Sequence, residues 1–153
     1  MGDRLMAHRW WGALALAVSV AALAAVACGG GGEEQGVALT LGDTTFSDHG
    51  TTNAAGKASL GLEADDFYFA PTFIQGVAGS KLTLEIGNES QTIHNFSLKA
   101  QGIDKDVPAG GKVTVEVTLP SSGVLLYSCK YHAGQGMNGE LIAGTGAPAA
   151  PPV

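Results

Sequence analysis

Apolar and polar side chains alternate in several short segments between residues 60 and 143. In KLTLEI (81–86) the two leucines and the isoleucine share one face, and KVTVEVTL (112–119) repeats this pattern with four apolar positions. A period of two is typical of strands that bury one face and expose the other. Since no segment here shows a helical period, the pattern predicts an all-β fold, either an antiparallel sandwich or a barrel.

The remaining expected strands are separated by the turn signals PAGG, PSSG and GNES. These strands are LGLEADDFYF (60–69), FIQGV (73–77), TIHNFSLK (92–99), GVLLYSC (123–129) and GELIA (139–143). We therefore expect one small domain over residues 60–143.

The first 27 residues have the layout of a secretory signal. Arg4 and Arg9 precede sixteen uncharged residues (12–27) that end in small side chains. This run is shorter than the roughly 20 residues of a membrane span, so an uncleaved anchor helix is the less favoured alternative. The end of this run, Val26-Ala27-Cys28, resembles the cleavage site of a bacterial lipoprotein signal. This resemblance implies that Cys28 is lipidated and anchors the protein to a membrane outside the cytoplasm. The alternative is cleavage without lipidation.

Two other segments look unlike domain material. Residues 28–59 are rich in Gly, Thr, Ser, Asp and Ala, and we expect a flexible tether with at most one marginal strand, VALTL (37–41). The Pro/Ala-rich tail, residues 144–153, is expected to be disordered.

Charge and cysteine content restrict the possible functions. Removal of residues 1–27 leaves 13 acidic and 6 basic residues and no arginine, a composition that disfavours nucleic-acid binding and suits partners with a basic docking face. If Cys28 is lipidated, Cys129 is a lone thiol in an exported protein. Packing, metal ligation and nucleophilic chemistry are the three explanations for such a thiol.

Four potential metal ligands should meet at one end of the fold. Alternation in 92–99 places His94 on the core-facing side of its strand, and Cys129 ends the strand 123–129. The glycine-rich loop that follows supplies His132 and Met137. One thiolate, two imidazoles and a thioether are the ligands of electron-transfer copper sites, whereas zinc has little use for a thioether.

These residues resemble the cupredoxins, and most closely their plastocyanin-like members. Cys129, His132 and Met137 match the family's Cys-x2-His-x4-Met ligand loop, and IHNF supplies the His94-Asn95 pair. The resemblance implies a Greek-key β-sandwich of about eight strands that binds one type 1 copper ion per chain. It implies a carrier of single electrons between Cu(II) and Cu(I), a monomer that meets redox proteins transiently and is not an enzyme.

The same resemblance assigns a role to each residue. Cys129 would be the in-plane thiolate, His94 and His132 the imidazole ligands, and Met137 the long axial contact. Asn95 would brace the copper loop.

Other functions remain as alternatives. The first is a copper-binding module that stores, delivers or senses copper without routine electron transfer. A multicopper enzyme is disfavoured, because only His8, in the signal, and His49, in the expected tether, remain as histidines. A metal-free adhesive sandwich leaves the ligand spacing unexplained.

Overall fold

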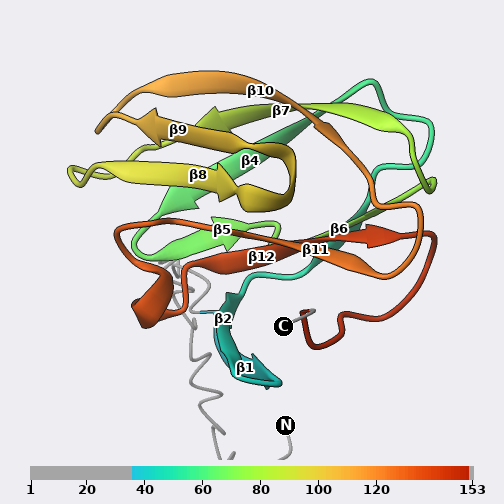
Figure 1. Ribbon diagram of the computed structural model, residues 1–153. Coiled ribbons are helices and arrows are strands. Elements are labelled where there is room, and N and C mark those ends of the chain that lie inside the picture. The colour runs from blue at the N-terminus through green and yellow to red at the C-terminus, as the bar shows by residue number, and fades with distance from the viewer. Residues whose placement is uncertain (1–35, 152–153) are drawn as a thin grey trace, which may run out of the picture. The chain divides into compact units, whose positions relative to one another are not determined.

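A computed structural model describes residues 36–151, which fold into two six-stranded β-sheets (Figure 1). The predicted signal (1–27), Cys28 and the start of the expected tether lie outside the described residues. In spatial order the first sheet consists of β1 (Val37–Leu41), β2 (Thr44–Asp48), β5 (Tyr68–Ala70), β4 (Ser59–Asp65), β7 (Lys81–Gly87) and β10 (Lys112–Thr118). The second consists of β3 (Thr51–Asn53), β6 (Phe73–Gly76), β12 (Asn138–Ala143), β11 (Val124–Ser128), β8 (His94–Leu98) and β9 (Ile103–Val107).

The all-β prediction is confirmed, with two corrections to its detail. The described residues form twelve strands, where about eight were expected. Both sheets are mixed, because β4 pairs with β7 in parallel and β6 pairs in parallel with both β3 and β12. Two short 3-10 helices, η1 (Lys99–Gln101) and η2 (Ala133–Gln135), interrupt the strands.

The main hydrophobic core lies between the two sheets. On β7 the apolar side chains Leu82, Leu84 and Ile86 are at most 2% exposed, as their alternation predicted. They pack in one cluster with side chains from the second sheet, including Phe96 of β8 and Tyr127 of β11. The apolar positions at the start of β10 are only partly buried, because this strand forms one edge of its sheet.

The marginal strand expected at 37–41 is present as β1, but the prediction of a flexible tether is wrong for residues 44–53, which contain β2 and β3. Strands β1 and β2 form an antiparallel hairpin, and β3 adds to the edge of the second sheet. The hairpin turns at two residues, with Gly42 at φ 58°, the glycine position of a type II′ turn. Its apolar side chains form a second, smaller core with Phe73 and Ile142, in which Phe46 is fully buried. Burial of this face explains why the segment is ordered.

Residues 60–69 were expected to be one strand, but they form the β4–β5 hairpin. Its two turn residues, Asp66 (φ 27°) and Phe67 (φ 69°), are the only described non-glycine residues with positive φ. Such a backbone costs of the order of 1–3 kcal/mol per residue and persists where the surroundings hold it. Here it turns Phe67 toward the predicted ligands.

The expectation of a disordered tail is also wrong for residues 144–149. The Gly144 N–H donates to the carbonyl of Gly76 (2.6 Å), and the Gln75 side-chain amide donates to the carbonyl of Gly146 (2.7 Å). The Ala149 N–H donates to a carboxylate oxygen of Glu140 on β12 (3.3 Å). The tail therefore lies against the second sheet. Within residues 36–151 no helix is long and apolar enough to cross a membrane.

Candidate metal centre

Three of the predicted ligands come together at one end of the sandwich. His94 opens β8, Cys129 directly follows β11, and His132 lies in the loop that leads into η2 (Figure 1). Their donor atoms, two imidazole nitrogens and the sulfur, all lie within 4.8 Å of one another. His94 and Cys129 are fully buried, whereas His132 is partly exposed.

The spacing of these donors fits a first-row transition metal. His132 Nδ1 lies 3.2 Å from His94 Nδ1 and 3.4 Å from Cys129 Sγ. Two bonds of about 2.0–2.3 Å that meet at a tetrahedral or trigonal angle separate their donors by roughly 3.3–3.7 Å. The three side chains are therefore close to the positions that a bound ion requires. A thiolate with two imidazoles is the donor set of electron-transfer copper sites.

Both imidazoles are favoured in the neutral form, which is the form that binds a metal. Burial lowers the pKa of His94 below its usual range, and the neighbouring His132 lowers it further, although the carboxylates of Asp65 and Asp66 oppose the shift. Burial also lowers the pKa of His132. Each ring therefore carries a single proton at neutral pH, and the tautomer decides whether the nitrogen that faces the centre is free to coordinate.

Backbone hydrogen bonds hold the ligand loop in a tight shape. The Cys129 N–H donates to the carbonyl of Met137 (2.9 Å), and the Met137 N–H donates to the carbonyl of His132 (3.3 Å). The His132 N–H in turn donates to the carbonyl of Cys129 (3.1 Å). Met137 is fully buried. The structure thus ties the fourth predicted ligand to the other two residues of the loop, and its axial role stays a prediction.

The β1–β2 hairpin braces this loop from outside. The Ser47 N–H donates to the carbonyl of Gly136 (2.8 Å), and the Asn138 side-chain amide bridges the carbonyls of Thr45 (2.8 Å) and Ala133 (3.0 Å). Gly136 has φ 95°, and a Cβ there would lie 3.2 Å from the backbone nitrogen of Ser47. Residues first expected to be a tether therefore help to shape the ligand loop.

Phe67 covers the two imidazoles. Its ring centroid lies 4.7 Å from that of His132 and 6.3 Å from that of His94, both in edge-on arrangements. The ring excludes water from one side of the centre. Sequence reasoning missed Phe67, because Asp65 and Asp66 fit an exposed strand edge as well as a turn, and neither interpretation indicates where Phe67 points.

Asn95 contacts the ligand loop where its bracing role was predicted. Its side-chain oxygen accepts a long hydrogen bond from the Lys130 N–H (3.4 Å), and its amide group donates to Asp104 (2.7 Å) and Asp106 (2.9 Å) on β9. The Lys130 ammonium group pairs with both aspartates, and the Tyr131 hydroxyl donates to Asp106.

These hydrogen bonds and ion pairs link β9 to Lys130 and Tyr131, the two residues between Cys129 and His132. Hydrogen bonds from Lys130 and Asn95 hold the pKa of each aspartate below its usual range, and the two aspartates raise the pKa of Lys130. No local pattern indicated these contacts, because the residues that make them come from segments distant along the chain.

Ser90 is a further contact that sequence reasoning missed. Its hydroxyl oxygen lies 3.1 Å from Nε2 of His94, the ring nitrogen that faces away from the other ligands. GNES (87–90) was interpreted only as a turn. A serine four residues before a ligand histidine, in the turn that enters its strand, was the available signal.

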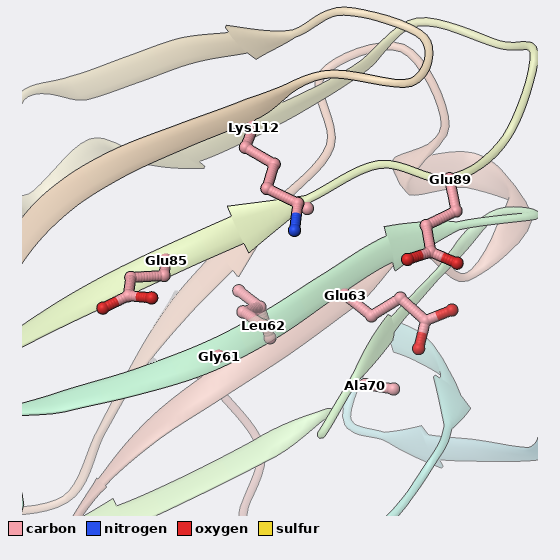
Figure 2. A pocket seen from close by; sticks show the side chains of 8 residues that line it. Gly61, Leu62, Glu63, Ala70, Glu85, Glu89 and Lys112 are labelled. Atoms are coloured by element: carbon pink, nitrogen blue, oxygen red, sulfur yellow. The ribbon is translucent and has the colours of Figure 1, made fainter.

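A separate groove of about 440 Å³ lies along β4, β5, β7 and β10 (Figure 2). Three carboxylates and one ammonium group surround it, from Glu63, Glu85, Glu89 and Lys112. It contains no cysteine or histidine. Among residues 36–151, the only group of three or more metal-binding side chains is that of His94, Cys129 and His132.

Comparisons with known proteins show the family to which the chain is similar. The family model of the cupredoxin-like domain matches residues 16–143. Plastocyanin A/B of Petroselinum crispum is 30% identical over 95 residues, which are 56% of this chain and 96% of that protein.

Solved structures are similar to this chain at low sequence identity. The crystal structure of the metal-binding domain of the Cu(I)-exporting P-type ATPase CopA of Streptococcus pneumoniae, with Cu(I), has a TM-score of 0.53 and 13% identity. That similarity covers 62% of this chain and 96% of that one. Reduced auracyanin of Roseiflexus castenholzii has a TM-score of 0.47 and 16% identity, and that similarity covers 60% of this chain and 98% of the auracyanin chain.

The fold and the His–Cys–His cluster define a copper protein of the cupredoxin type. The chain belongs to the cupredoxin-like family, as the resemblance of its ligand loop predicted. At the level of that family, its members are copper-binding electron carriers, and the cluster supports one copper ion per chain.

Proposed function

We propose that this protein is a type 1 copper electron carrier that acts outside the cytoplasm. The observation that carries the proposal is the convergence of two imidazole nitrogens and one thiol sulfur within 4.8 Å. In the proposed site His94, Cys129, His132 and Met137 would hold the ion, with the thiolate and the two imidazoles as strong ligands and the thioether as a weak one. The bound copper supplies a one-electron couple between Cu(II) and Cu(I).

The chain's own contribution is a ligand set that changes little between oxidation states. His94 is fixed at the start of a buried strand, and the loop from Cys129 to Met137 is closed by its own backbone hydrogen bonds. The β1–β2 hairpin holds the same loop through Gly136. A preorganised site needs little rearrangement when it gains or loses an electron, which favours fast transfer.

His132 is the proposed route for the electron. It is the only one of the three clustered ligands that is not fully buried. Its sequence neighbour Tyr131 is 46% exposed, and Ile93, next to His94, is 45% exposed. A small, partly apolar surface suits brief contacts with a redox partner protein.

The proposed location rests on the sequence before residue 36. We infer that residues 1–27 direct export and that lipidation of Cys28 anchors the protein to a membrane. A Cys28→Ala variant should appear in the soluble rather than the membrane fraction of cells. Equal membrane retention would contradict the lipid anchor and leave the copper proposal intact.

Copper binding is tested by titrating the full-length, metal-free protein with Cu(II) and recording visible absorption and EPR spectra. We expect an intense thiolate-to-copper charge-transfer band and a narrow copper hyperfine splitting at one equivalent. Cys129→Ala should abolish the band, whereas Cys28→Ala, the matched control, should keep it. Colourless or weakly held copper would contradict the carrier and favour the storage, delivery or sensing module.

A further inference from the structure

The orientation of the Asn88 side chain is fixed by its surroundings. Asn88 is only 2% exposed, and its amide nitrogen lies 2.8 Å from the carbonyl oxygen of Thr92 and 3.0 Å from that of Val107. Carbonyl oxygens can only accept, so the NH₂ group must face them. The amide oxygen consequently points to Ser90, where it accepts from the Ser90 N–H (3.0 Å).

The Ser90 hydroxyl has two acceptors other than His94 for its single proton. Its oxygen lies 2.8 Å from the Asn88 amide oxygen and 3.1 Å from the Thr92 carbonyl oxygen, and both of these atoms are acceptors. A serine hydroxyl carries one proton, and these two acceptors compete with His94 for it. The Ser90 oxygen also accepts from the Thr92 N–H (3.1 Å). With its proton on either acceptor, the oxygen faces Nε2 of His94, at 3.1 Å, as a hydrogen-bond acceptor.

This arrangement favours one tautomer of the ligand His94. We propose that Ser90, held by Asn88, is a positioning residue that keeps the proton of His94 on Nε2 and leaves Nδ1 bare toward the metal centre. The proposal deepens the proposed function, on which its copper readout rests. Histidine ligands commonly donate their distal N–H to such a partner, which fixes the tautomer and the ring orientation. Here the partner is the hydroxyl oxygen of Ser90.

The tautomer is measured first, in the metal-free full-length protein. Long-range ¹H–¹⁵N NMR of the imidazole rings at pH 8 reports which nitrogen carries the proton. In the wild-type protein we expect the proton of His94 on Nε2, and in Ser90→Ala we expect a mixture of both tautomers. A wild-type His94 with its proton on Nδ1, or an unchanged tautomer in Ser90→Ala, would overturn the proposal.

Copper affinity is the second readout, measured by competition of the Cu(I)-loaded protein with a chelator. Loss of such a partner typically weakens metal binding by about 10- to 100-fold, which we expect for Ser90→Ala. Ser90→Thr keeps the hydroxyl and should restore the affinity. Ser80→Ala removes a serine that bonds to the Val77 carbonyl in another turn, and it should behave as wild type.

The two readouts separate the two proposals. If the wild-type protein binds no copper, the proposed function fails, and the NMR result still decides the role of Ser90. If copper binds and Ser90→Ala has the affinity of Ser80→Ala, the positioning role is wrong and the electron carrier stands.

Discussion

Glu140 is a carboxylic acid buried in an apolar environment. Its side chain is fully buried on the outer face of β12, where Phe73 and Leu126 are its neighbours on the adjacent strands. One oxygen accepts from the Ala149 N–H (3.3 Å), and the other is the only buried side-chain polar atom in the described part of the chain that has no hydrogen-bond partner. Such an environment penalises the charged form of the acid.

Burial raises the pKa of Glu140 from 4.5 to about 7, and the Ala149 N–H opposes only part of this shift. Between these two values the folded protein keeps a proton that the unfolded chain has lost. The contribution of Glu140 to the free energy of unfolding is therefore highest below pH 4.5, falls as the pH rises toward 7, and then levels off. At about 1.36 kcal/mol per pKa unit, the difference corresponds to at most about 3 kcal/mol.

Glu140→Gln removes the ionisable proton and keeps the shape of the side chain. The free energy of unfolding of metal-free wild-type protein and variant is measured by urea denaturation, followed by circular dichroism, between pH 4 and pH 8. We expect the variant to gain up to about 3 kcal/mol relative to wild type over this range. The contributions of other titrating groups cancel in the difference.

The exposed Glu85 provides the matched control. Glu85→Gln makes the same substitution without removing a buried carboxyl group, so we expect it to lack the gain predicted for Glu140→Gln. A Glu140→Gln difference that stayed constant from pH 4 to pH 8 would refute the reasoning, because it would mean that the folded protein ionises Glu140 as easily as the unfolded chain does.

Three further predictions follow from the site and the hairpin. Met137→Leu should keep a coloured copper site and shift its reduction potential, measured by redox titration, because the axial ligand tunes the potential; an unchanged potential would remove Met137 from the ligand set. Phe46→Ala should lower the free energy of unfolding by about 3–5 kcal/mol, whereas Val37→Ala, at a 73% exposed position, should have little effect; equal stability would show that the hairpin is not part of the fold. Gly136→Ala should lower the free energy of unfolding by about 1–3 kcal/mol and speed copper loss to a chelator, because Gly136 has φ 95° and its new Cβ would lie 3.2 Å from the Ser47 nitrogen. Gly134→Ala, where a Cβ would meet nothing within 4 Å, is its control.

The ligand cluster could be predicted from sequence because its information is local. Cys129 and His132 are three residues apart in one loop, and strand alternation places His94 on the same face of β8 as the core residues Phe96 and Leu98. The alternation of β7 likewise indicated its buried face, because each residue's neighbours reveal which side is apolar. Donor chemistry then narrowed the metal to copper.

The β1–β2 hairpin was missed because its apolar face is small and discontinuous. Leu39 and Leu41 indicate one marginal strand, but Phe46 lies among polar residues, and no local pattern pairs it with that strand. They become a core only when Phe73 and Ile142 of the second sheet supply the other half. The two-residue turn at Gly42 was the one available signal, and it predicts a hairpin without saying where the hairpin packs.

By itself, the sequence determined the strand periodicity and the type of metal centre, because both depend on residue types at short, fixed spacings. Tertiary structure alone decided what surrounds the ligands. Ser90 meets Nε2 of His94, Phe67 covers the imidazoles, and Glu140 is buried beneath the tail. Such contacts join side chains on different turns and strands, and only the completed packing of both sheets brings them within hydrogen-bonding or van der Waals distance.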